Sequence, residues 1–301
     1  MVEQRLRYIV ARWGWDPKIF CWEIWNELDL FPNFKNLVPQ IVAWHRHVAA
    51  YLRSVDLNRH LISTSFARGD RQPDIWRVQE LDFVSSHPYL STDLGGKFVD
   101  LVRRRLELEP RPYFIGEFGT KFEWLATRPD LDPDAVHVHN GIWASVLAGS
   151  SASALFWGWD YNDRFMGRIQ RHYGALSRFC ANIPWTAAKF RPADFRATRL
   201  PQDLASPELR TVGLIGDHLA ILWVQNLQHT LANIVEKKPI PPVTGARIVL
   251  AGVPVRQRCT IEWWDTSKGE VTRTQEAVVT SEVLSLDLPD LAEDVALKVR
   301  W

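Results

Sequence analysis

The sequence predicts an α/β fold with parallel strands, followed by an antiparallel β-sandwich. Two observations favour the first part: short apolar runs of strand length recur through residues 1–190, and amphipathic segments with helical periodicity separate them. Beyond about residue 190, proline-rich connectors lead into short alternating segments divided by Asn, Gly, Pro and Asp, which is typical of a sandwich. We therefore expect two domains, residues 1–190 and 191–301.

The composition is that of an ordinary globular protein, with 301 residues, 46% hydrophobic residues and a formal net charge of +1. Near-zero charge gives no support for nucleic acid or a membrane as partner. No apolar run reaches the roughly 18 residues of a transmembrane helix. The first residues, MVEQRLRYIVARWG, are charged and amphipathic and do not predict a signal peptide, so both a cytoplasmic and a secreted location stay open.

The helices and strands are predicted from the spacing of apolar residues, because helices repeat apolar residues every three or four positions and buried strands are short apolar runs. The predicted helices cover residues 2–14, 37–55, 74–80, 97–108, 134–148 and 172–182. The predicted strands of the first domain cover residues 19–27, 60–66, 81–89, 113–119 and 152–160. Those of the second domain cover residues 210–215, 219–225, 246–250, 258–265, 271–279, 284–288 and 295–301, with a hairpin turn at 267–270. Since a closed barrel of parallel strands has eight, the first domain is predicted to be a partial (β/α)₈ barrel.

Polar and aromatic side chains stand near the ends of the predicted parallel strands, where barrels carry their catalytic groups. Two carboxylic acids at such ends suit retaining glycoside hydrolysis, in which one protonates the leaving oxygen and the other attacks the anomeric carbon. Aromatic rings can pack against the C–H faces of sugars. The candidates are Asn26, Glu27, His87, Tyr89, Glu117, Trp157 and Trp159.

Two further acid and histidine patterns have simpler explanations. Glu23 shares a face with Glu27 by strand alternation and is expected to be a buried structural acid with a partner on a neighbouring strand. His137 and His139 are two residues apart on a helix and cannot share a face, so they do not predict a metal pair. The three cysteines lack CxxC spacing, and we expect no metal and no cofactor.

Four motifs resemble the clan A (β/α)₈ glycoside hydrolases, near the cellulase- and mannanase-like members of glycoside hydrolase family 5. WEIWNE, SSHPY, IGEFG and LFWGWD look like the fourth, sixth, seventh and eighth strands of that family, and IEWWDTSKGE resembles the tail of members with a C-terminal β-sandwich. The resemblance implies the following roles: Glu27 as general acid/base, Asn26 as a substrate-binding residue, Glu117 as nucleophile, His87 and Tyr89 as an active-site pair, and Trp157 as an aromatic platform.

Two hypotheses follow. The first is a retaining glycosidase that cleaves β-1,4-glucan or β-mannan type glycans by double displacement. No part of this sequence resembles the first three strands of the family. We therefore expect a second chain or an upstream segment to complete the barrel. The second is a non-catalytic carbohydrate-binding or scaffolding protein with a degenerate, incomplete barrel, which glycan binding without turnover would identify. The sugar and the choice between endo and exo action stay open.

Overall fold

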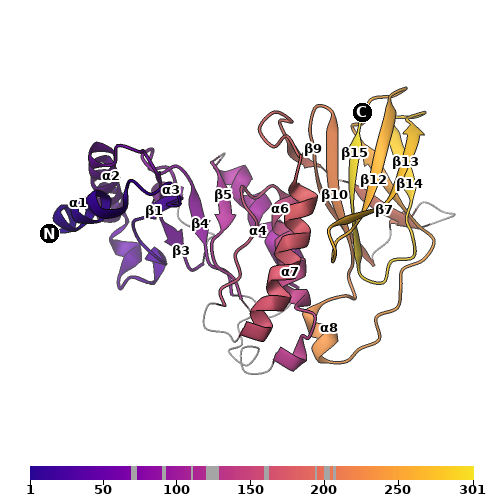
Figure 1. Cartoon of the computed structure of the whole chain (residues 1–301), viewed down its shortest axis with the longest axis horizontal. Coiled ribbons are helices and arrows are strands. Elements are labelled where there is room, and N and C mark those ends of the chain that lie inside the picture. The colour runs from indigo at the N-terminus through magenta and orange to yellow at the C-terminus, as the bar shows by residue number, and fades with distance from the viewer. Residues whose placement is uncertain are drawn as a thin grey trace. The chain divides into compact units, whose positions relative to one another are not determined.

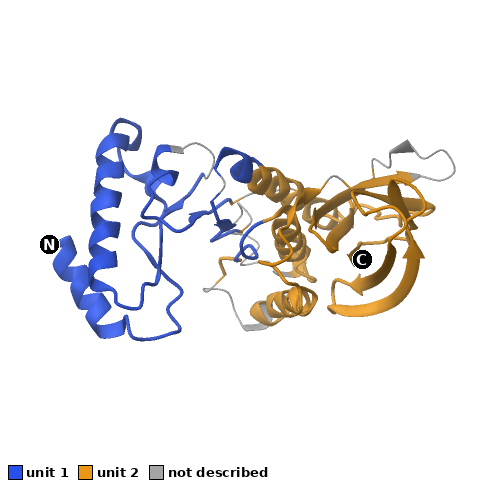
Figure 2. Ribbon diagram, turned by 90° about the horizontal axis from the view of Figure 1, so that it is seen from above, with its two compact units in different colours: residues 1–88, 104–118, 150–155 blue, residues 89–103, 119–149, 156–301 orange. Residues whose placement is uncertain are grey.

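The structure is a computed structural model that describes residues 1–68, 73–89, 93–109, 111–119, 129–158, 163–193, 195–199, 204–205 and 208–301. Its elements run from helix α1 to strand β15 (Figure 1). The chain divides into two compact units (Figure 2). Unit 1 comprises residues 1–88, 104–118 and 150–155, and unit 2 comprises residues 89–103, 119–149 and 156–301. The domain boundary expected near residue 190 falls inside unit 2, so that division remains a prediction.

Unit 1 contains parallel strands separated by helices, in agreement with the predicted α/β class. Its strands are β1 (Cys21–Glu23), β2 (Leu61–Ser63), β3 (Ser65–Phe66), β4 (Val84–Ser86) and β5 (Tyr113–Ile115). Strand β1 pairs in parallel with β2, β3 with β4, and β4 with β5. Thr64 alone separates β2 from β3, so the two behave as one interrupted strand.

A further extended segment of unit 1 lies beside β5. The Leu155 amide donates to the Ile115 carbonyl at 3.0 Å, and the Leu155 carbonyl accepts from the Phe118 amide at 2.8 Å. Each extended segment of unit 1 therefore pairs with the next one along the chain. This order brings the ends of the first, third and fourth predicted strands to one edge.

The helices of unit 1 cover its strands with apolar faces. They are α1 (Val2–Trp13), α2 (Val38–Val55), the short α3 (Pro73–Trp76) and part of α4 (Leu94–Leu108), with single 3₁₀ turns at Leu28–Leu30 and Phe34–Asn36. Val48 and Leu52 of α2 pack with Val10 of α1 and Ile62 of β2 in one buried cluster. The spacing of Val48 and Leu52 places both on the same face of α2, as their period predicts.

Unit 2 contains the 3₁₀ turn Pro129–Leu131 and the helices α6 (Val136–Ala148), α7 (Asp163–Cys180) and α8 (Leu231–Val235). Helix α6 is buried along its whole length. Helix α7 starts well before the predicted residue 172. The sequence did not predict this start because the first turns of the helix carry few apolar residues from which a period could be read. Among the described residues, no helix combines the length and apolar character that crossing a bilayer requires.

Two antiparallel sheets of unit 2 share one hydrophobic core. Six strands pair in the order β13-β12-β15-β10-β9-β6, and four pair in the order β14-β11-β7-β8. Both sheets contribute buried side chains, such as Leu222 and Leu297 from the first and Ile248 and Leu286 from the second. The bounds are β6 (Arg191–Ala193), β7 (Arg196–Arg199), β8 (Leu204–Ala205), β9 (Leu209–Ile215), β10 (Leu219–Asn226), β11 (Ala246–Ala251), β12 (Arg258–Asp265), β13 (Glu270–Val278), β14 (Val283–Asp287) and β15 (Asp294–Arg300).

The seven predicted strands of the second domain are confirmed within one or two residues, whereas β6, β7, β8 and α8 were not predicted. The missed strands are too short to carry a readable alternation. The predicted hairpin turn joins β12 to β13, and Gly269 there has a φ of 65°, a left-handed conformation that glycine adopts without steric cost.

A buried histidine pair connects α6, α7 and β15 within unit 2. His139 Nε2 lies 2.7 Å from Asp294 Oδ2, the two Nδ1 atoms of His139 and His172 are 3.1 Å apart, and His172 Nε2 lies 2.6 Å from the Asp134 carbonyl. Forming all three hydrogen bonds needs three N–H protons on the two rings, one more than two neutral imidazoles carry. The extra positive charge balances the Asp294 carboxylate.

Two members of this network, Asp294 and His172, have shifted pKa values. Burial raises the pKa of Asp294, but the charge and hydrogen bond of His139 outweigh it and hold the pKa below its ordinary value. Burial and the charge of His139 lower the pKa of His172 to about 4, so His172 is the neutral ring at neutral pH. Arg171 also lowers this pKa, whereas the Asp134 carbonyl and Asp132 oppose the shift.

We expect acid to destabilise unit 2 through His172. Between pH 6.5, the ordinary pKa of His172, and about pH 4, its pKa in the folded chain, His172 is protonated in the unfolded chain and neutral in the folded chain. The free energy of unfolding should therefore fall with decreasing pH across this window, by at most about 1.4 kcal/mol per pH unit from this one group. Urea unfolding of the whole chain at several pH values should show a shallower slope for His172→Gln, and an equal slope in the variant would contradict this origin.

Lys298 of β15 is a second buried polar group in unit 2, with only 2% of its surface exposed. Its Nζ lies 4.2 Å from the ring centre of Trp264 and 4.9 Å from that of Phe179, and it donates to the Ala181 carbonyl at 3.4 Å. Burial lowers the pKa of Lys298 to about 8, against the opposing charge of Glu262. The cation is thus incompletely compensated for the loss of water.

Replacing Lys298 by Met should stabilise unit 2 at pH 7 by about 1–2 kcal/mol, because an apolar chain of similar length avoids the desolvation of a charge. Thermal unfolding and urea titration would measure the difference. Lys189→Met is the matched control, since Lys189 is 78% exposed beside Asp217 and its loss should change stability by less than about 0.5 kcal/mol. A destabilised Lys298→Met variant would mean that the cation–π contacts outweigh the desolvation cost.

Candidate active site

The chain turns abruptly where β1 ends, and Glu27 occupies the turn. Its backbone has φ 50° and ψ 50°, the left-handed conformation that costs an L-residue with a side chain roughly 1–2 kcal/mol. Ser65 holds this turn, since its Oγ accepts the Glu27 amide at 3.1 Å and its hydroxyl donates to Asn26 Oδ1 at 3.3 Å. Strain at a polar residue that the surroundings fix is a reason to look for function there.

One histidine bridges the two predicted catalytic acids inside unit 1. His87 follows β4, and its Nδ1 lies 3.3 Å from Glu27 Oε1 and 3.5 Å from Glu117 Oε2. His87 is 3% exposed, whereas the side chains of Glu27 and Glu117 are 25% and 26% exposed. One oxygen of each carboxylate and a nitrogen of the imidazole all lie within 4.8 Å of one another. The ends of three parallel strands thus bring together a buried base and two accessible acids.

The electrostatics of the cluster differ between its members. Burial raises the pKa of Glu27, and the nearby carboxylate of Asp29 raises it further. Burial lowers the pKa of His87, although Glu117 and Asp29 act in the opposite direction. His87 is therefore neutral at neutral pH, with its proton on Nδ1, where both neighbours are carboxylates.

The remaining predicted site residues lie in different parts of the structure. Asn26 is exposed at the end of β1 and bonds Ser65. Tyr89 and Trp157 belong to unit 2, where their half-buried rings meet edge to face at 6.5 Å. The backbone of Tyr89 forms an isolated parallel bridge with Gly119. Trp159 lies outside the described residues.

Two residues near the cluster were not predicted. The sequence places Ser65 within the predicted strand 60–66, and the structure shows that its hydroxyl orders both Asn26 and Glu27. A small polar residue within a buried strand is the signal that could have indicated this role. Asp29 accepts the backbone amides of Ala67 and Arg68 and so ties the loop after Glu27 to the end of β3. The loop that carries the acid is therefore anchored from the neighbouring strand.

The expectation for Glu23 is wrong as to burial, because the residue is exposed. The expected partner on a neighbouring strand is present, since the carboxylate is hydrogen-bonded with Ser65 of β3. Strand β1 pairs with β2 on one edge, and no described strand pairs with its other edge.

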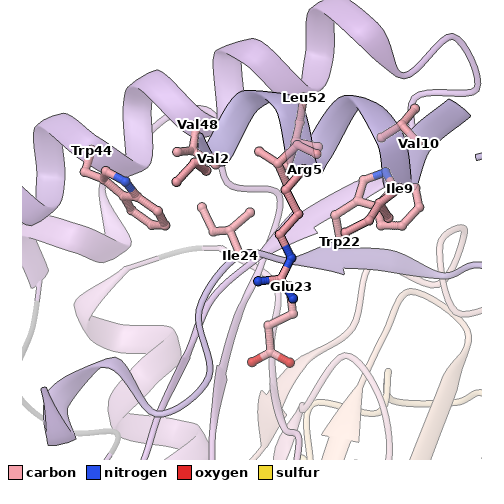
Figure 3. Close-up of a pocket in the computed structure, with 11 residues that line it drawn as sticks. Val2, Arg5, Ile9, Val10, Trp22, Glu23, Ile24, Trp44, Val48 and Leu52 are labelled. Carbon is pink, nitrogen blue, oxygen red and sulfur yellow. The ribbon is translucent and has the colours of Figure 1, made fainter.

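A groove of about 360 Å³ lies between α1, α2 and β1 in unit 1 (Figure 3). Apolar side chains dominate its lining, including Val2, Trp22, Ile24 and Trp44, and Arg5 extends from α1 toward Glu23 (Figure 3). Large hydrophobic side chains elsewhere in this part of the chain are also exposed, among them Trp15 at 71% and Phe20 at 62%. Apolar exposure on this scale is typical of a surface that another polypeptide covers.

No protein-family model and no curated protein sequence matches the chain. Several solved structures are similar to it. A glycoside hydrolase matches with a TM-score of 0.66 at 13% identity, over 99% of this chain and 68% of its own. A glycoside hydrolase family 5 protein from Bacteroides vulgatus matches with a TM-score of 0.63 at 14% identity, over 99% of this chain and 66% of its own. A family 30 endoxylanase from Clostridium papyrosolvens matches with a TM-score of 0.53 at 14% identity, over 99% of this chain and 70% of its own.

The chain thus spans about two thirds of the length of these structures. At such low sequence identity, the similarity shows a shared fold, and this similarity extends over almost all of the chain. The resemblance expected from the four motifs is confirmed at that level: this chain has a mixed α/β fold similar to that of the clan A glycoside hydrolases of families 5 and 30.

Proposed function

We propose that this protein is a retaining glycosidase that cleaves β-linked glycans of the β-1,4-glucan or β-mannan type, with Glu27 as acid/base and Glu117 as nucleophile. One observation carries the proposal: a single buried imidazole lies within 3.5 Å of both carboxylates, where parallel strands end. Catalytic groups of (β/α)₈ enzymes occupy such strand ends.

The spacing of the acids supports a retaining mechanism. Retaining enzymes hold their two carboxyl groups about 5–5.5 Å apart, whereas inverting enzymes separate them by about 6.5–9.5 Å to admit a water. Here the nearest oxygens of Glu27 and Glu117 lie within 4.8 Å. This distance leaves the nucleophile within reach of the anomeric carbon while the acid reaches the departing oxygen.

Double displacement then assigns each acid its step. Glu27, with its raised pKa, donates a proton to the glycosidic oxygen while Glu117 attacks the anomeric carbon and forms a covalent glycosyl ester. Glu27, now ionised, takes a proton from water, which attacks the ester and frees Glu117 with the configuration retained. His87 supports both steps by donating its Nδ1 proton to whichever carboxylate is ionised.

The other predicted residues would bind the sugar. Asn26 is exposed beside the acid, fixed by Ser65, and its amide can bond a sugar hydroxyl. Tyr89, Trp157 and Trp159 are proposed as contacts for the C–H faces of a pyranose from their positions in the sequence alone.

We also propose the finer architecture expected from the sequence, a partial barrel followed by a β-sandwich. The parallel segments of unit 1 would be five of the eight barrel strands, and the two sheets with a common core in unit 2 would form the sandwich. No strand among the described residues pairs with the second edge of β1, and this edge and the apolar groove beside it support the docking of further strands, from a second chain or an upstream segment.

Hydrolysis of a panel of β-glucans, β-mannans and aryl β-glycosides tests the function. We expect turnover that Glu117→Gln removes, while Glu3→Gln, a surface change beside His47, leaves it intact. Glycan binding by the folded chain without turnover would favour the alternative, a non-catalytic carbohydrate-binding protein. The supporting observation is that β1 has one partner strand, β2, in the part of the chain that the structure describes. Equal turnover in wild type and Glu117→Gln would refute the assignment of the nucleophile.

A further inference from the structure

We propose that Glu27, His87 and Glu117 form a binding site for a divalent transition-metal ion, with Zn²⁺ as the representative, and that occupation of this site switches off the hydrolase. The binding depends on the geometry alone, and only its inhibitory consequence rests on the proposed function. The site would be regulatory, since the double displacement described above uses both carboxylates in the metal-free state.

Two of the three distances between ligand atoms match the edges of a zinc coordination polyhedron. Zinc binds imidazole nitrogen and carboxylate oxygen at about 2.0–2.2 Å, which puts neighbouring tetrahedral ligand atoms roughly 3.3–3.5 Å apart. His87 Nδ1 lies 3.3 Å from Glu27 Oε1 and 3.5 Å from Glu117 Oε2. The ligand atoms of all three residues lie within 4.8 Å of one another, so the third edge, between the two carboxylates, is the one that binding of the ion would adjust.

The chemistry of the donors selects the ion. Two carboxylates and a neutral imidazole supply two negative charges and one nitrogen, a set that suits Zn²⁺, Co²⁺, Ni²⁺ and Cu²⁺ better than Mg²⁺ or Ca²⁺, which prefer all-oxygen sites. His87 is 3% exposed and held at the end of β4, so its nitrogen is oriented before an ion arrives. The partly exposed carboxylates leave a route for entry and a fourth position for water.

A bound ion would block both catalytic steps. It would replace the proton that His87 shares with the carboxylates and engage one oxygen of each acid, so that Glu27 could no longer donate and Glu117 could no longer attack. Inhibition should therefore be reversed by a chelator and weakened by a glycan that occupies the same acids.

Calorimetric titration of the chelator-treated whole chain with Zn²⁺ and with Mg²⁺ tests the site, together with the visible spectrum of added Co²⁺. We expect one Zn²⁺ per chain, intense Co²⁺ bands of tetrahedral type, and no binding of Mg²⁺. Glu117→Gln and His87→Gln should each weaken Zn²⁺ binding at least roughly tenfold. His47→Ala is the matched control, because it removes an exposed His–Glu pair with Glu3 and should leave the affinity unchanged.

The outcomes separate this proposal from the proposed function. Zn²⁺ binding with the expected variant pattern, in a protein that cleaves no glycan even after chelation, would support the metal site and contradict the hydrolase. Glycan cleavage without Zn²⁺ binding, or with binding that Glu117→Gln and His87→Gln leave unchanged, would overturn the metal site and leave the hydrolase standing.

Discussion

Replacing Glu117 by Gln is expected to reduce turnover of every glycan substrate by about 10⁴-fold or more, the range measured when a catalytic nucleophile is removed from an enzyme. The amide keeps the size and the hydrogen-bonding capacity of the side chain but cannot form the glycosyl ester. Because Glu117 is partly exposed and is not needed for packing, the fold should persist, and glycan binding should change little.

Initial rates on an aryl β-glycoside and on a polysaccharide measure the loss, with circular dichroism as the check on folding. A slow fluorinated glycoside should in addition label the wild type, and mass spectrometry should place the label on the peptide that contains Glu117. Labelling of another carboxylate, or a variant that retains more than about a hundredth of the wild-type rate, would be inconsistent with Glu117 as nucleophile.

Replacing Glu27 by Ala should produce a loss that depends on the leaving group. General acid catalysis contributes roughly 10²–10⁴-fold, so glycans and other substrates with poor leaving groups should slow by about that factor. Aryl glycosides whose phenolate departs without protonation should form the glycosyl ester almost normally and stall at its hydrolysis. Azide, a nucleophile that needs no general base, should restore their turnover and yield a β-glycosyl azide.

The pH profile supplies an independent readout for Glu27. Its pKa is raised by burial and by Asp29, and the protonated form is the one that acts in the first step. Activity of the wild type should therefore fall as the pH rises through the pKa of Glu27, and this basic limb should vanish in Glu27→Ala. A uniform loss over all leaving groups, with an unchanged profile, would point to a structural role for Glu27.

The sequence was sufficient for the elements with long, regular patterns. Helix α2 and strand β10 lie within one or two residues of their predicted bounds, because apolar periods over many residues leave little ambiguity. The sequence also placed Glu27, His87 and Glu117 at the ends of predicted parallel strands, which lie close together when the strands are neighbours. The position of His87 between the two acids was not predicted.

Other features depended on contacts between distant residues. The left-handed turn at Glu27 is held by Ser65, which no local pattern links to it. The exposure of Glu23 accompanies a strand that has a described partner on one edge alone, which is a property of the sheet and not of the strand. The shared proton of His139 and His172 required two helices and β15 to be in place before the hydrogen bonds could be counted.

The stereochemistry of hydrolysis tests the central claim most directly. Proton NMR of the first products, recorded before mutarotation, distinguishes the two anomers of the new reducing end. Two carboxylates with oxygens within 4.8 Å of each other predict that the β-anomer appears first and the α-anomer only as it equilibrates. Initial formation of the α-anomer would contradict the double displacement through Glu117 and would require a water between the two acids.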